Sequence, residues 1–181
     1  DQGLYLRGVQ GGTYKITARI YKGRVLRVDK ALPGEPETKD LHFAQMETRS
    51  DSDKTNSCGQ SFWMEEVNGI YIADAWLFWD DFGPVFRKVN DITILHLENG
   101  WAHTGIRFEG CSRVHIAKFA LGDETYTTTQ MVVTSAPDGT RWKDFYMGTY
   151  FSFLVGTSIL AEHSQEDANF VIEGSVFASN D

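Results

Sequence analysis

NGWAHTGIRFEGCSRVHIAKFALGDETYTTTQMVV, residues 99–133, is the stretch around which the rest of the chain is interpreted. It holds two strand-like runs. Ile106 and Phe108 fall on one face of a short strand, and a longer apolar run over residues 114–121 ends at the turn pair Gly122-Asp123. If the protein binds a small ligand, we expect the loops at the two ends of this stretch to lie near it.

Alternating residues extend this β pattern outward in both directions. Tyr14 and Ile16 share one face of a strand over residues 13–21, and Lys22-Gly23 predicts a tight turn and a hairpin with residues 24–28. The run over residues 69–79 is apolar on both faces apart from Asp74, which predicts one central, buried strand. Further strands are predicted over residues 41–46, 85–89, 92–97, 124–134, 145–159 and 168–177. Ten or more short strands without a long amphipathic helix predict an all-β antiparallel β-sandwich.

The length of 181 residues fits a single domain. Within it we expect a Gly-rich arm over residues 1–12 and a polar loop over residues 48–59. The longest apolar candidate, residues 145–160, is interrupted by Gly148 and Ser152, so a soluble protein without a transmembrane segment is predicted. The chain opens at Asp1 without an apolar signal segment, and localisation stays open between secreted and cytoplasmic.

Charge and cysteine content narrow the classes of partner. The chain is acidic, with 25 Asp and Glu against 17 Lys and Arg and a net charge of -8, so a nucleic-acid partner is not expected. Cys58 and Cys111 are the two cysteines, and they form either one disulfide or buried thiols, of which the thiol is favoured.

Catalytic motifs do not occur in the sequence, which contains neither Gly-x-Ser-x-Gly nor His-Glu-x-x-His. The five histidines are scattered, so we expect no metal and no cofactor. Asp74 beside Trp76 is the most suggestive carboxylate, because burial would raise its pKa. We favour a plainer role, in which Asp74 pairs with an Arg or faces solvent, and predict that the protein is not an enzyme.

Aromatic residues give the stronger indication, at 13% of the chain. Trp101 and Trp142 lie beside polar, turn-rich segments, where an aromatic ring can stack on a sugar while nearby polar groups bind its hydroxyls. Trp76 and Trp79 lie inside the apolar run and are assigned to the core. The pattern therefore favours carbohydrate binding.

Four segments, in order, resemble the fungal fruit-body lectin family, whose fold is the actinoporin-like β-sandwich. Residues 13–21 (TYKITARIY) resemble its opening strand, and residues 161–172 resemble its last hairpin. TGIRF (104–108) and KFAL (118–121) are similar to its two central strands. The segment over residues 33–82 has no counterpart there.

The resemblance also implies where a ligand would bind. In that family, a loop before the first central strand and a His-Asn pair after the second bind a galactose-type disaccharide. The matching positions here are Gly100-Trp101 and Gly122-Asp123, so the loop locations and the Asp123 carboxylate carry over, and sugar specificity does not.

The leading hypothesis is a non-enzymatic, lectin-like module that binds a glycan or glycoprotein by stacking and hydrogen bonds. Its predicted site comprises Asn99, Trp101, His103, Asp123 and Trp142.

Three alternatives remain. One is a membrane-active, actinoporin-like toxin, although residues 1–12 are too Gly-rich for the amphipathic helix it needs. Another is a structural or assembly β domain of a virus or appendage, which forms a homo-oligomer through exposed aromatics. The last is an enzyme that uses Asp74.

Overall fold

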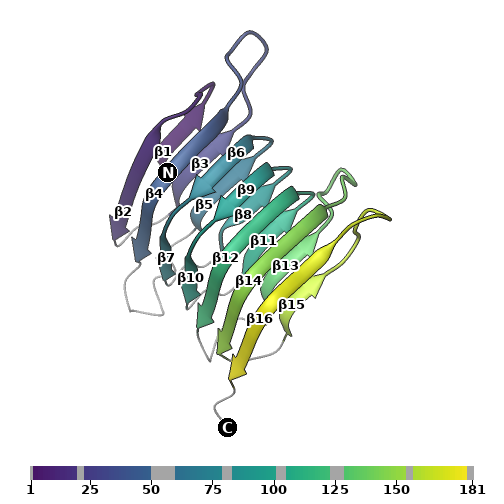
Figure 1. Ribbon diagram of the computed structural model, residues 1–181. Helices are drawn as coiled ribbons and strands as arrows, with labels where there is room; N and C mark the ends of the chain where they lie inside the picture. The colour runs from purple at the N-terminus through teal and green to yellow at the C-terminus, as the bar shows by residue number, and fades with distance from the viewer. Residues whose placement is uncertain are drawn as a thin grey trace.

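The structure is a computed structural model that describes residues 2–19, 23–49, 60–78, 83–100, 105–122, 129–153 and 157–178. In these residues the chain forms sixteen strands and no helix. The strands lie in two sheets, and every strand pair described is parallel. Figure 1 shows the sheets face to face, with the chain passing from one to the other and advancing by one strand spacing each time. The fold is a two-sheet parallel β-solenoid.

Each turn of the solenoid, here called a coil, adds one rung to each sheet. The first sheet consists of β1 (Gln2–Arg7), β3 (Arg24–Asp29), β5 (Gln60–Glu65), β8 (Val85–Arg87), β11 (Ile106–Glu109), β13 (Thr129–Thr134) and β15 (Thr157–Ala161). The second sheet consists of β2 (Thr13–Arg19), β4 (Lys39–Arg49), β6 (Asn68–Ile72), β7 (Ala75–Phe78), β9 (Asn90–Ile94), β10 (Leu97–Gly100), β12 (Ser112–Gly122), β14 (Lys143–Phe153) and β16 (Phe170–Ala178). Coils 1 to 7 begin at the seven strands of the first sheet in turn.

The all-β prediction is confirmed, but the predicted antiparallel, actinoporin-like sandwich is wrong. No two described strands that follow one another in the chain pair as a hairpin: β2 pairs with β4, and β3 pairs with β1 and β5. Consecutive strands lie in different sheets, except β6 with β7 and β9 with β10, which share the second sheet. The hairpin predicted around Lys22-Gly23 therefore does not form. The error has a physical cause, because side chains alternate with a period of two in parallel and antiparallel strands alike.

Coils 3, 4 and 5 repeat with a spacing of 22 residues. Asn68 pairs with Asn90, and Asn90 pairs with Ser112. Their side chains form a hydrogen-bonded ladder, with the Asn90 amide donating to Asn68 at 3.0 Å. The residue after each of them has a positive φ: Gly69 at 68°, Asp91 at 57° and Arg113 at 53°. This shared conformation turns the chain from the first sheet into the second in the same way in each coil.

The core fills the space between the two sheets. Its inward-facing residues stack in columns from coil to coil, as Met64, Phe86 and Phe108 do in the first sheet. The rings of Phe86 and Phe108 lie parallel at 5.0 Å, and Phe145 of the second sheet meets Phe108 edge-on. The columns bury apolar area in every coil, which is the main stabilising term of the fold.

Several local predictions also change. The segment expected to be an arm contains β1, which pairs with β3. The strand expected over residues 69–79 is two strands, β6 and β7, separated by a break at Ala73 and Asp74. Of the predicted loop over residues 48–59, Thr48 and Arg49 end β4, and residues 50–59 lie outside the described residues. Cys111 is a free, buried thiol, and Cys58 lies outside the described part.

Candidate functional site

The structure does not assemble the predicted site. Asn99 lies in β10 with 3% of its surface exposed, and Trp142 lies just before β14 with 5% exposed. Asn99 is level with the far end of β14, about 30 Å from Trp142 at the usual rise per strand residue. The Trp142 indole donates a hydrogen bond to the Glu162 carbonyl at 2.7 Å and offers no open ring face to a ligand. Trp101, His103 and Asp123 lie outside the described residues.

A different group of side chains meets on the outer face of the second sheet. Asp74 lies in the break between β6 and β7, Trp76 follows in β7, and His96 occupies the position of Asp74 one coil later. The Trp76 Nε1 donates to Asp74 Oδ2 at 2.8 Å. The Asp74 Oδ1 lies 2.6 Å from His96 Nδ1. We call these three residues the indole cluster.

The cluster holds an exposed aromatic ring in one orientation. Trp76 is 38% exposed, although its Nε1 is tied to Asp74. The His96 ring meets it edge-on at 5.2 Å and 74°. An ionised carboxylate only accepts hydrogen bonds, so the contact with Asp74 places a proton on His96 Nδ1. The indole is thus fixed from two sides, with part of its surface left open to solvent.

Acidic side chains flank this ring within the sheet. Glu47 of β4 and Glu98 of β10 are the register partners of Trp76 on its two sides. The Glu47 carboxylate pairs with Arg19 at 3.4 Å. Leu95, which precedes His96, is 42% exposed and adds apolar surface. The ring therefore lies between hydrogen-bond acceptors, an arrangement suited to a ligand with an apolar face and hydroxyl groups around it.

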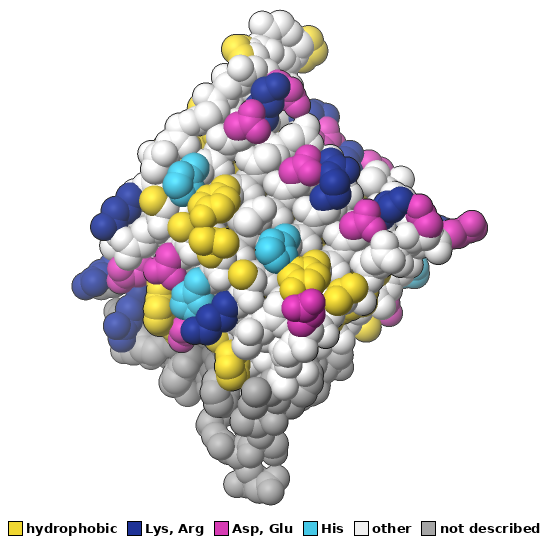
Figure 2. Space-filling view, in the orientation of Figure 1, with side chains coloured by type: hydrophobic (Ala, Val, Ile, Leu, Met, Phe, Trp, Pro, Cys, Tyr) yellow, Lys and Arg dark blue, Asp and Glu magenta, His cyan; other side chains and the backbone are white. Residues whose placement is uncertain are grey.

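Two further aromatic pairs occupy one outward row of the same sheet. The row runs through His42, Tyr71, Thr93, His115, Tyr146 and Val171 in register, and we call it the histidine–tyrosine row. The rings of His42 and Tyr71 lie 4.7 Å apart, as do those of His115 and Tyr146. Figure 2 shows histidine and hydrophobic side chains gathered on this face, with charged side chains more frequent toward its margins.

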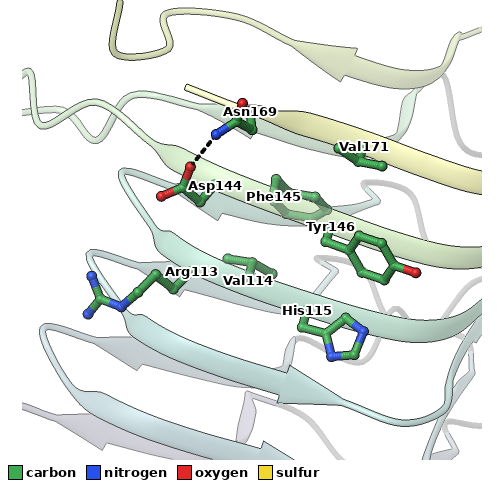
Figure 3. Close-up of a pocket in the computed structure, with 8 residues that line it drawn as sticks. All are labelled: Arg113, Val114, His115, Asp144, Phe145, Tyr146, Asn169 and Val171. Atoms are coloured by element: carbon green, nitrogen blue, oxygen red, sulfur yellow. Dashed lines mark hydrogen bonds between the residues drawn. The ribbon is translucent and has the colours of Figure 1, made fainter. Parts of the chain in front are cut away.

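A shallow hollow of about 350 Å³ lies at the C-terminal end of this row, over β12, β14 and β16. Figure 3 shows the rings of His115 and Tyr146 at one end, and the hydrogen bond from Asn169 to Asp144, 2.9 Å long, at the other. The Arg113 guanidinium also lines the hollow, but it is bound to Asp91 through two hydrogen bonds. Its charge is therefore balanced within the protein.

The first sheet presents a different surface. Its half-buried tryptophan, Trp63, is covered by the guanidinium groups of Arg24 and Arg87, which lie 5.0 and 4.4 Å from the ring centre. Arg87 is itself paired with Glu65 and Glu109. Because cations already lie over its ring, Trp63 offers no open aromatic platform comparable to Trp76.

The sequence assigned Trp76 to the core, and the structure places it outside. In an unbroken strand, Trp76 would share a face with Ile70 and Ile72. The two residues at the break, Ala73 and Asp74, shift the alternation, so Ala75 and Leu77 are buried and Trp76 turns outward. The spacing of 22 residues between Asp74 and His96 is the signal that could have paired them, once the repeat is recognised.

Comparison with protein families, with characterised proteins and with solved structures gives no match. The resemblance to the lectin family in sequence therefore stays a prediction. The sandwich fold that it implies is wrong. Among the described residues no group of three or more His, Cys, Asp or Glu side chains could hold a metal ion. Within that same part of the chain, the structure contains no helix with the length and apolar character that a membrane crossing requires.

Proposed function

We propose that the protein binds an extended glycan, without catalysis, along the outer face of the second sheet. The observation that carries this proposal is the exposed indole of Trp76, held by Asp74 and His96. A sugar ring stacks its apolar face on an indole and directs its hydroxyls to groups around the ring edge. Glu47 and Glu98 are the acceptors nearest in register.

The restricted orientation of the Trp76 ring also supports this function. A side chain that is free in solution loses rotamer entropy when a ligand orders it, at a cost of about 0.5–1.5 kcal/mol. The hydrogen bond to Asp74 and the edge contact with His96 already restrict Trp76, which reduces that cost. Both oxygens of Asp74 hold ring donors, so we assign this carboxylate a positioning role and propose no reaction for it.

The shape of the face favours a long ligand over a small one. Neighbouring rungs of a sheet lie about 4.8 Å apart, so the histidine–tyrosine row presents polar and aromatic groups at regular steps along the solenoid. A chain of sugars lying along the solenoid would meet the His42–Tyr71 pair first and the His115–Tyr146 pair three rungs later. The hollow next to Tyr146 extends this path.

The test compares Trp76→Ala with Tyr5→Ala on a glycan array, followed by calorimetric titration of the best-bound oligosaccharide. Tyr5 is an exposed aromatic residue of the first sheet, so its removal is a matched control. We expect Trp76→Ala to weaken binding about tenfold or more and Tyr5→Ala to leave it unchanged. Absence of glycan binding by the wild-type protein, or equal binding by both variants, would contradict the proposal.

A further inference from the structure

We propose that the ligand of Trp76 carries a positive charge, so that the glycan contains amino sugars with free amines. The inference rests on the proposed function, which supplies the glycan, and it names the class of sugar that the same site selects. A sugar ring stacked on the indole would direct its ammonium group to the carboxylate of Glu98, the register partner of Trp76 on β10.

A second tryptophan of this protein shows how such a site is completed by a cation. Trp63, on the first sheet, donates a hydrogen bond from Nε1 to Glu65 at 3.1 Å. The Arg87 guanidinium lies 4.4 Å from the centre of the Trp63 ring and pairs with Glu65 and Glu109. The carboxylates beside this indole and the negative π surface of its ring thus hold one cation together.

Trp76 has similar neighbours but no such cation. Its Nε1 donates to Asp74, and Glu98 occupies the next rung, about 4.8 Å away. Among the described residues no Lys or Arg side chain lies over the exposed ring of Trp76. The hydrogen bond to an anion polarises the indole and makes its ring face more negative, which strengthens its attraction for a positive charge.

The carboxylate of Glu98 is available to the ligand. It is half-buried, and in the described part of the chain it makes no hydrogen bond and no ion pair. Lys118 lies one rung further along, on β12, but no ion pair joins it to Glu98. Glu47, on the other side of Trp76, is already paired with Arg19. Since a half-buried carboxylate without a counter-ion gains most from an ammonium partner, we assign Glu98 to the amine of the ligand.

The histidine of the indole cluster does not supply the missing charge. His96 Nε2 is buried and has no hydrogen-bond partner within the residues that the structure describes. A proton on this atom would create a buried N–H group without an acceptor, which costs free energy. The neutral imidazole, with its proton on Nδ1 toward Asp74, is therefore the form that fits the structure. The indole cluster then carries the negative charge of Asp74 alone.

Charge therefore separates three kinds of sugar at this site. A protonated amine contacts Glu98 and the indole together, an N-acetyl group brings no charge, and the carboxylate of a uronic acid is repelled by Glu98. The net charge of the chain, -8, acts in the same direction, because it attracts a polymer of amino sugars and repels an acidic polysaccharide.

The experiment is a calorimetric titration at pH 6, where primary amines are protonated, with two β-1,4-linked oligosaccharides of equal length. One consists of glucosamine, and the other is its N-acetylated form. We expect the wild-type chain to bind the glucosamine oligomer about tenfold more tightly, and added salt to weaken only that binding. Glu98→Gln should weaken binding of the glucosamine oligomer about fivefold or more and leave the affinity for the acetylated oligomer unchanged.

Asp40→Asn is the matched control, since it removes the same charge from the exposed start of β4, roughly 20 Å from Glu47, and should alter neither affinity. Equal binding of both oligomers, or an equal loss of both in Glu98→Gln, overturns this inference, while the glycan proposal stands if Trp76→Ala still abolishes binding. If the wild-type chain binds no glycan, both proposals fail. Binding of oligolysine that is lost in Trp76→Ala would then assign the site to a basic peptide.

Discussion

Cys111 illustrates how the interior of the solenoid controls a single side chain. Its thiol is 1% exposed, and Sγ donates to the Phe86 carbonyl at 3.4 Å. Burial raises the pKa of this thiol to about 12, because the thiolate would lose its hydration. In the two preceding coils the same position is occupied by Val67 and Val89. Cys111 therefore acts as a small apolar residue.

We predict that Cys111 does not react with a thiol reagent while the protein is folded. The measurement uses the Cys58→Ser variant at pH 8, with and without urea, so that Cys111 is the only thiol. Modification in buffer should follow the rate of unfolding, whereas modification in urea should be complete at once. An unfolded thiol ionises from about pH 8.5, so this group makes stability fall as pH rises above that value. Rapid labelling of the folded variant would contradict the prediction.

Ion pairs hold together the turns that join the two sheets. Lys88, at a positive φ of 52°, binds Glu66 and Asp138. Hydrogen bonds to those carboxylates raise the pKa of Lys88 to about 12. Lys30 and Lys88 hold the pKa of Glu66 below its usual value, and Lys88 does the same for Asp138. One ammonium group thus links the turns of coils 3, 4 and 6.

We predict that the protein loses stability in acid, and that this loss depends on the ion pairs of Lys88. Carboxylates with lowered pKa values stabilise the fold above their unfolded pKa, near 4, and lose that contribution as pH falls through the folded value. Urea unfolding of the wild type should therefore show a lower midpoint at pH 3 than at pH 7. Lys88→Met should reduce this difference, and Lys118→Met should leave it unchanged. An equal difference in all three proteins would contradict the assignment.

Individual strands are more predictable than their partners. Alternation over residues 13–21 correctly predicts a strand whose Tyr14 and Ile16 face the core. It cannot predict that β2 pairs with β4, because alternation reports only which face a side chain occupies. The recurrence of Val-Asn-Gly-Ile at residues 67–70 as Val-Asn-Asp-Ile at residues 89–92 carries the pairing information.

The candidate site follows the same rule. The apolar residues around Asp74 in the sequence single it out. Its contacts with Trp76 and His96, however, depend on the way the strands are broken and stacked. Trp76 turns outward only because the strand breaks before it, and His96 arrives only because one coil has 22 residues. Both facts follow from the coil geometry, so a site prediction based on a sandwich could not include them.

At the scale of the whole molecule, stability should decrease from the middle coils toward the ends. The described strands of each coil pair only with strands of the neighbouring coils, and the end coils have partly exposed inward side chains. We predict that amides of β1, β2, β15 and β16 exchange with deuterium faster than those of β8, β9 and β12, measured by mass spectrometry at low protein concentration. Uniform protection along the chain would indicate a single cooperative unit.

The equal length of coils 3 and 4, 22 residues each, also governs how this protein could change in size. Glu66 and Lys88 occupy equivalent positions, so a deletion or tandem duplication of the 22 residues 66–87 leaves every later side chain on the face where it began. A single inserted residue would instead reverse the facing of the strand that receives it. Internal duplication can therefore lengthen the outer face of the second sheet by whole rungs while the sequence of each existing rung stays the same.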